Sequence, residues 1–197
     1  MTFTRRASLI GLLSLPLGSI DGISTASRVT QLVRAARSQI GVTTLYDPAY
    51  VHLDYPGGDV PRDRGVCIDV IIRAYRDAFD FHFQDPIPRD SAANFAAPPT
   101  TCRLSRPARN LDHRRVPNLE TWLTRYGHEL NIQPFQPGDL ITCRVGGSLP
   151  HIGIVGDRKD RRGTYTAIHN IGLGTREDRR IWAYGHQRRF RFLPPTA

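Results

Sequence analysis

The chain has 197 residues, of which 40% are hydrophobic and 23% are charged, and its formal net charge at pH 7 is +9. This length and composition predict one domain with a substantial core. No apolar run reaches the roughly 18 residues that a membrane-spanning helix requires, which excludes stable membrane insertion of the mature protein. The basic excess suits an anionic partner, such as nucleic acid, lipid headgroups or a cell-wall polymer.

The N-terminal segment has the pattern of an export signal. Arg5 and Arg6 precede an apolar stretch over residues 7–20, and Ser24-Thr25-Ala26 offers small residues for a peptidase. Glycine and proline interrupt the stretch, which disfavours a buried helix. We therefore predict a signal peptide over residues 1–26 and one mature domain over 27–197, periplasmic or secreted. The paired arginines are compatible with the twin-arginine route and with ordinary secretion.

Three helices are predicted in the first two thirds of the chain. Apolar residues recur at helical spacing over 27–40, with Gly41 at the stop, then over 67–79, and again over 118–126, with Gly127 at the end. Residues 42–66 have loop-like composition. Residues 84–117 contain six prolines, and they predict an irregular excursion.

Strands follow the helices. Period-two or continuous apolar patterns cover 139–145, 151–157 and 165–172, and two further strand arms flank Tyr184-Gly185. Helices followed by an antiparallel sheet indicate a single α+β domain. Arginines alternate with aromatics over residues 176–191, but no known nucleic-acid motif accompanies them. We therefore predict a solvated basic strand pair and no nucleic-acid partner.

The three cysteines leave several roles open. An odd number in an exported chain leaves at least one thiol without an internal partner. Cys102 and Cys143 could pair in an oxidising compartment, which would leave Cys67 free, but the sequence does not fix this pairing. The histidines are scattered and no zinc motif is present, so we predict neither a metal nor an organic cofactor.

Cys67 stands where a helix is predicted to begin. Unpaired backbone N–H groups and the helix dipole favour a thiolate at such a position, and they can stabilise an oxyanion. From this stretch alone, an ordinary buried core cysteine is the favoured interpretation.

Two histidines supply a base. If residues 151–156 and 164–171 form a hairpin around the polar turn 157–163, His151 and His169 face each other, and a two-residue slip keeps both on one face. Two imidazoles near a helix-start cysteine suggest a base and an orienting residue.

Several motifs together resemble a known family. "QPGDLI" at 136–141, "PHIGIVGD" at 150–157 and "AIHN" at 167–170 are similar to the C-terminal half of the NlpC-type papain-like cysteine peptidases of bacterial cell walls. The resemblance implies a papain-like α+β fold with Cys67 as nucleophile, His151 as general base and His169 as orienting residue. It also implies an oxyanion role for Tyr55, twelve positions before Cys67.

The sequence departs from that pattern near the nucleophile. The family's Asp-Cys-Ser-Gly is replaced by "RGVCIDV", and the excursion before "QPGDLI" is longer. "YPGGDVPRDRGVC" and "NLDHRRVPN" resemble a more specific exported bacterial family known only as a domain of unknown function. That resemblance covers most of the mature chain.

Further residues are candidate substrate contacts. Arg64 either favours the thiolate or holds substrate, while Asp63 is a candidate cap of the Cys67 helix. Asp112, His113 and Arg114 precede the third helix. They are either solvated residues at the helix entry or a clamp in which Arg114 or its neighbour grips a carboxylate. His113 is also a rival base.

These observations favour an exported cysteine hydrolase that cleaves an amide bond in peptidoglycan, as an endopeptidase or an amidase, with peptidoglycan stem peptides as its partner. Two alternatives remain open. One is an acyltransferase or transpeptidase on the same fold, and the other is a non-catalytic wall-binding or nucleic-acid-binding module.

Overall fold

The computed structural model describes residues 24–49, 51–94 and 110–196. The helical elements in these ranges are α1 (Thr25–Arg37), α2 (Cys67–Phe79), α3 (Pro86–Ala93), η2 (Asp112–Arg114), α4 (Val116–Arg125) and η3 (Arg180–Ala183). The strands are β1 (Leu45–Tyr46), β2 (Arg64–Gly65), β3 (Glu129–Leu130), β4 (Leu140–Val145), β5 (Leu149–Lys159), β6 (Tyr165–Asn170), β7 (Thr175–Asp178) and β8 (Gly185–Phe190).

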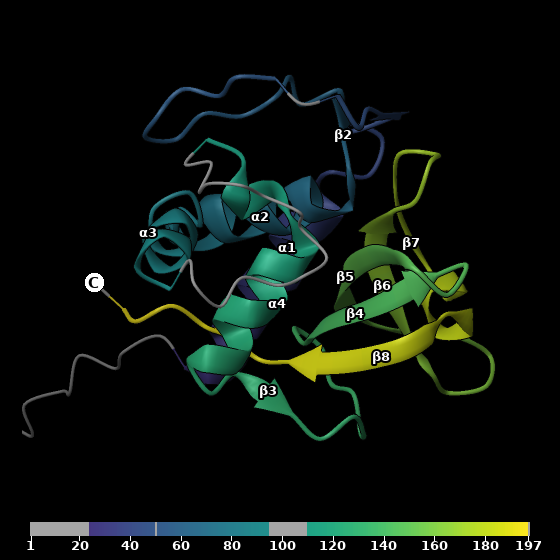
Figure 1. Cartoon of the computed structure of the whole chain (residues 1–197). Helices are drawn as coiled ribbons and strands as arrows, with labels where there is room; N and C mark the ends of the chain where they lie inside the picture. The colour runs from purple at the N-terminus through teal and green to yellow at the C-terminus, as the bar shows by residue number, and fades with distance from the viewer. Residues whose placement is uncertain (1–23, 50, 95–109, 197) are drawn as a thin grey trace, which may run out of the picture.

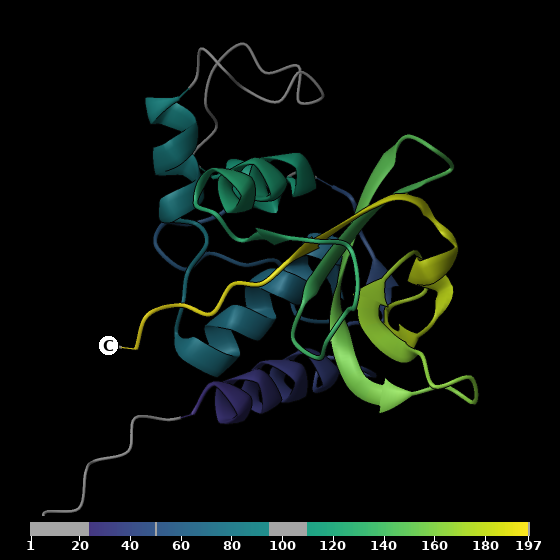
Figure 2. The same cartoon turned by 90° about the horizontal axis from the view of Figure 1, so that it is seen from below.

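The α+β prediction is confirmed. Six strands form a twisted antiparallel sheet in the order β3-β8-β4-β5-β6-β7, and the short strands β1 and β2 pair in parallel beside it. The α-helices gather on one side of this sheet (Figures 1 and 2). Helix α2 packs between α1 and the central strand β5, so its N-terminus is held against the sheet.

Helix α2 occupies the predicted range, Cys67–Phe79. Its apolar residues are buried against both α1 and the sheet, which fits its nearly continuous hydrophobic sequence. Tyr75 anchors the far end: its ring packs on Phe83 and Phe192, and its hydroxyl donates to the Phe192 carbonyl. The helix stops at Asp80, which adopts a left-handed conformation.

The first described helix, α1, overlaps the predicted cleavage site of the signal peptide. Helix α1 begins at Thr25, and the Ser24 side chain caps it by accepting from Ser27 N–H at 3.2 Å. Thr25 and Ala26, where we predict signal cleavage, thus lie in its first turn. Residues 1–23 lie outside the described ranges, and the signal peptide stays a prediction.

The irregular excursion was predicted incorrectly over its first part. Residues 86–93 form α3, which begins with Pro86 at the helix start and buries Ile87. Proline is favourable in a first turn, so its presence does not exclude a helix there. Residues 95–109 of the predicted excursion lie outside the described ranges.

The predicted strand arms around Tyr184-Gly185 do not pair with each other. Strand β7 pairs with β6, whereas β8 pairs with β4 and β3, and η3 separates them. The physical reason lies in Ile181, which is fully buried in a second core on the sheet face opposite the helices. This second core also contains Phe135, Ile141, Cys143, Val155 and Ala167.

The basic C-terminal strand is largely matched by carboxylates. Arg189 and Arg191 both bind the fully buried Asp139, and Arg188 binds Glu129. These three arginines therefore serve the fold, whereas Arg176, Arg179 and Arg180 of the same segment are exposed, as predicted. Within the described ranges, no helix combines the length and the apolar content needed to cross a membrane.

Candidate active site

The first turn of α2 is built by Asp69. Its carboxylate accepts from the Val66 N–H at 2.8 Å and so caps the helix from inside, a role we predicted for Asp63. Asp63 instead pairs with Arg64. Gly65 is required beside this cap because it has a φ of 154°, and a Cβ there would lie 2.9 Å from the Asp69 carboxylate.

Arg114 binds the Asp69 carboxylate that caps α2. Its guanidinium binds the two Asp69 oxygens at 2.8 and 2.9 Å, and both side chains are buried. The bidentate geometry that we predicted for a substrate carboxylate is thus used on a carboxylate of the protein itself. Arg114 still lines the pocket that contains Cys67.

The Cys67 thiol lies where two strands separate. The ladder between β5 and β6 includes Ile154 paired with Ile168 and does not extend to Ile152. The Ile152 N–H donates to Cys67, whose side chain belongs to the helix-side core. Burial raises the pKa of the thiol to about 12, and nearby Asp69 adds to this effect. Cys67 is therefore a neutral thiol at pH 7, contrary to the expectation drawn from the helix start alone.

The two histidines lie on one face of the sheet. The observed register is displaced by two residues from the predicted one, so Gly153 stands opposite His169. A Cβ at Gly153 would approach the His169 Cβ to 3.1 Å, so only glycine leaves room for that ring. His151 Nε2 and His169 Nδ1 are 2.9 Å apart. We call these two residues the imidazole pair.

A carboxylate holds the His169 end of the imidazole pair. His169 Nε2 lies 3.0 Å from Asp178 Oδ1, while His151 Nδ1 has no hydrogen-bond partner among the described residues. His151 as a whole is 3% exposed. No hydrogen bond joins it to Cys67 in this structure, although its neighbour Ile152 contacts the sulfur.

Both imidazoles are neutral at pH 7. Burial, reinforced by His169, lowers the pKa of His151 to about 3. Burial also lowers the pKa of His169, although its hydrogen bond to Asp178 opposes this effect. The resting site therefore combines a neutral thiol with a neutral base.

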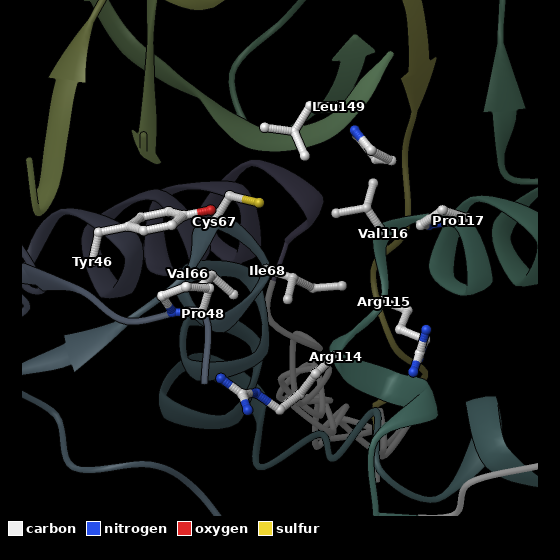
Figure 3. A pocket seen from close by; sticks show the side chains of 11 residues that line it. Tyr46, Pro48, Val66, Cys67, Ile68, Arg114, Arg115, Val116, Pro117 and Leu149 are labelled. Carbon is white, nitrogen blue, oxygen red and sulfur yellow. The ribbon is translucent and has the colours of Figure 1, made fainter. Parts of the chain in front are cut away.

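A pocket of about 300 Å³ opens beside Cys67 (Figure 3). The Cys67 sulfur points into it, and the Tyr46 ring extends toward Cys67 from β1. The other lining residues are Pro48, Val66, Ile68, Arg114, Arg115, Val116, Pro117, Leu149 and Pro150. The pocket is thus mainly apolar, with cationic side chains on one side.

Tyr46 was missed by sequence reasoning. It reaches the site because β1 and β2 pair in parallel and place Tyr46 opposite Gly65, two residues before Cys67. A two-residue parallel pair leaves no periodic signal in a sequence. Asp178 was missed because η3 was predicted as part of a strand arm.

Several predicted contacts do not line this pocket. Tyr55 donates to Asp85, and Arg64 pairs with Asp63 and Asp47 on the surface. Asp112 and His113 are buried beneath the start of α4. Burial, reinforced by Arg114, lowers the pKa of His113 to about 4, so His113 is a neutral core residue.

Of the two cysteines that could pair, Cys102 and Cys143, the structure describes Cys143. Cys143 carries a free, buried thiol and lies opposite His151 in the β4–β5 ladder. Cys102 lies outside the described ranges. Among the residues that the structure describes, no three His, Cys, Asp or Glu side chains group together in a way that could hold a metal ion.

The buried histidines predict acid sensitivity. His113, His151 and His169 all have a pKa below the ordinary value of about 6.5, so the unfolded chain binds more protons than the folded one below that pH. Stability is thus fully present above about pH 6.5 and falls as the pH is lowered toward 4. We expect the urea midpoint to drop between pH 7 and pH 5.

Substitution of single histidines tests which of them causes the loss of stability at low pH. His113→Gln is expected to flatten the decline, whereas His52→Gln, at an exposed position, is expected to leave it unchanged. Equal midpoints at pH 7 and pH 5 for the wild-type protein would contradict the assignment.

Comparisons with known proteins identify a family whose description names no function. A family model described as "Domain of unknown function (DUF1287)" matches residues 33–192. The chain is also 48% identical over 162 residues to the "Uncharacterized protein YijF" of Escherichia coli strain K12. That alignment covers 79% of this chain and 78% of the relative.

Proposed function

The chain belongs to the DUF1287 family, whose description assigns no activity, and we propose from the site itself that it is an exported cysteine hydrolase that cleaves an amide bond in peptidoglycan. The observation that carries the proposal is the imidazole pair: His151 Nε2 and His169 Nδ1 lie 2.9 Å apart, His151 Nδ1 has no hydrogen-bond partner among the described residues, and the backbone of Ile152, next to His151, reaches Cys67 at the start of α2. This order of cysteine, base histidine and orienting residue supports a papain-like, NlpC-type mechanism.

The first half-reaction forms a thioester. His151 Nδ1 takes the Cys67 proton as the sulfur bonds to the substrate carbonyl carbon. The same proton then passes to the leaving nitrogen as the C–N bond breaks, so an amine departs. Because thiol and imidazole are neutral at rest, proton transfer accompanies attack and does not precede it.

The second half-reaction restores the enzyme. Water attacks the thioester, and His151 takes its proton and returns it to the sulfur as the C–S bond breaks. The products are a carboxylic acid and the free thiol, with no net oxidation or reduction. His169 keeps the His151 ring in place through both steps.

Backbone N–H groups at the start of α2, together with the Tyr46 hydroxyl, are the proposed oxyanion donors. Figure 3 supports this role for Tyr46, whose ring extends toward Cys67. The substrate class is supported by the motif resemblance and by the net charge of +9, which suits an anionic wall polymer.

The test is digestion of purified peptidoglycan sacculi, followed by mass spectrometry of the released fragments. Wild type and Cys143→Ala, which removes the other described thiol, are expected to release peptide fragments, and Cys67→Ala is not. Folded wild type that releases no more than Cys67→Ala would contradict the hydrolase for this substrate. Ligation to an added amine in place of hydrolysis would instead indicate an acyltransferase, and binding without cleavage would indicate a non-catalytic module.

The two tyrosines allow a matched comparison. Tyr46→Phe is expected to lower kcat by about 10²-fold, the effect of losing one oxyanion donor. Tyr55→Phe is expected to leave kcat unchanged because its hydroxyl binds Asp85 away from the pocket. The assay is fragment release from sacculi under substrate saturation. An equal loss in both variants would remove Tyr46 from the mechanism.

A further inference from the structure

The imidazole pair is hydrogen-bonded to a carboxylate, that of Asp178. Asp178, at the end of β7, places Oδ1 3.0 Å from His169 Nε2. The same oxygen accepts from the Arg180 N–H at 2.8 Å, which holds the carboxylate in place at the start of η3. We call His151, His169 and Asp178 the histidine–aspartate chain.

Asp178 is ionised at neutral pH. Burial alone would raise its pKa, but the hydrogen bonds from Arg180 N–H and from His169 outweigh burial and hold the pKa below its ordinary value. An ionised carboxylate accepts hydrogen bonds and cannot donate them. The hydrogen between Asp178 and His169 must therefore reside on His169 Nε2.

The hydrogen on His169 Nε2 determines where the other ring protons of the histidine–aspartate chain lie. A neutral imidazole carries one N–H, so His169 Nδ1 has a lone pair. The 2.9 Å contact between His169 Nδ1 and His151 Nε2 then requires a hydrogen on His151 Nε2. His151 Nδ1 is left with a lone pair, and this is the nitrogen without a partner among the described residues.

We propose that Asp178 is a positioning residue that fixes the tautomer of both histidines, so that His151 keeps its Nδ1 lone pair available to the Cys67 proton. This proposal rests on the proposed function for its purpose. The assignment of the ring protons of His151 and His169 does not depend on the identity of the substrate.

A purely structural role makes a different prediction. If Asp178 only caps the turn through Arg180 N–H, its removal changes stability and leaves the histidine tautomers as they were. Direct observation of the ring protons separates the two roles. The charged groups that act on the imidazole pair are Asp178, which acts on both rings, and Arg180, which acts on His169.

The experiment is long-range ¹H–¹⁵N correlation NMR at pH 7 on full-length protein labelled with ¹⁵N-histidine. His151→Gln and His169→Gln assign the ring signals. In wild type, both rings are expected to be in the Nε2–H form. In Asp178→Ala, an Nδ1–H population is expected on at least one of them. Asp178→Asn is expected to keep the wild-type form because its amide oxygen can accept both hydrogen bonds.

Asp157→Ala serves as the control, since this carboxylate also forms an ion pair on the sheet but binds Arg37. It is expected to leave both tautomers unchanged. An Nδ1–H signal on either ring of wild type would overturn the proposal, even if Asp178→Ala fails to fold. Unchanged tautomers in folded Asp178→Ala would overturn it as well.

Activity adds a second readout. In Asp178→Ala, kcat is expected to fall in proportion to the fraction of His151 that loses the Nε2–H form. If no variant cleaves peptidoglycan while the tautomers shift as predicted, the proposed function fails and the proton order survives. If cleavage is robust while the tautomers do not shift, the proposed function survives and the role of Asp178 fails.

Discussion

Replacement of His151 by glutamine is expected to lower kcat/KM for peptidoglycan cleavage by about 10²- to 10⁴-fold, the usual contribution of a general base. The glutamine amide can still donate to His169 Nδ1, so the buried contact is kept while the base is lost. The loss is expected to be large because burial leaves Cys67 without intrinsic thiolate character. The measurement is the initial rate of fragment release at several substrate concentrations.

The matched control is His52→Gln, at an exposed position. It is expected to keep the wild-type kcat/KM, and the thermal midpoints of both variants verify that they are folded. His151→Gln that retains more than half of the wild-type rate would show that another group takes the Cys67 proton.

The largest expected effect on stability comes from the buried ion pair at the start of α2. Arg114→Met is expected to reduce the free energy of unfolding by about 3–5 kcal/mol because it leaves the Asp69 carboxylate buried and without its partner. The same change loosens the turn that presents Cys67, since Asp69 also caps Val66. Urea denaturation at pH 7 measures the loss.

Two comparisons isolate this ion pair. Arg62→Met breaks an exposed pair with Asp77 and is expected to cost about 1 kcal/mol or less. The double variant Asp69→Asn/Arg114→Met is expected to recover much of the loss, because the asparagine oxygen still accepts from Val66 and no buried charge remains. A cost for Arg114→Met no greater than that of Arg62→Met would refute the assignment.

The elements that depend on local pattern were predictable. Helix α2 occupies its predicted range because its apolar spacing is unbroken, and the face shared by His151 and His169 survives a two-residue register shift because side chains alternate along a strand. The catalytic pairing of Cys67 with His151 stays a prediction, and the structure brings the backbone of Ile152, next to His151, to Cys67. The bounds of a helix and the face that a strand residue occupies depend only on regular spacing of residues that are close in the sequence.

The features that were missed depend on long-range placement. Tyr46 reaches the pocket through a two-residue parallel pairing, and Asp178 reaches His169 because η3 diverts the chain between β7 and β8. Arg114 was predicted to bind substrate because no sequence pattern links it to Asp69, 45 residues away. The pKa of Cys67 was predicted in the wrong direction because burial outweighs the effect of a helix start.

The central claim is that Cys67 forms a covalent intermediate with the help of the imidazole pair. Acid quenching during turnover of soluble peptidoglycan fragments, followed by intact-mass and peptide mass spectrometry, tests it directly. The account predicts a transient adduct with the mass of the acyl half of the substrate on the peptide that contains Cys67, absent from Cys67→Ala and strongly reduced in His151→Gln. Product formation by Cys67→Ala at the wild-type rate, or an adduct on another residue, would contradict the claim.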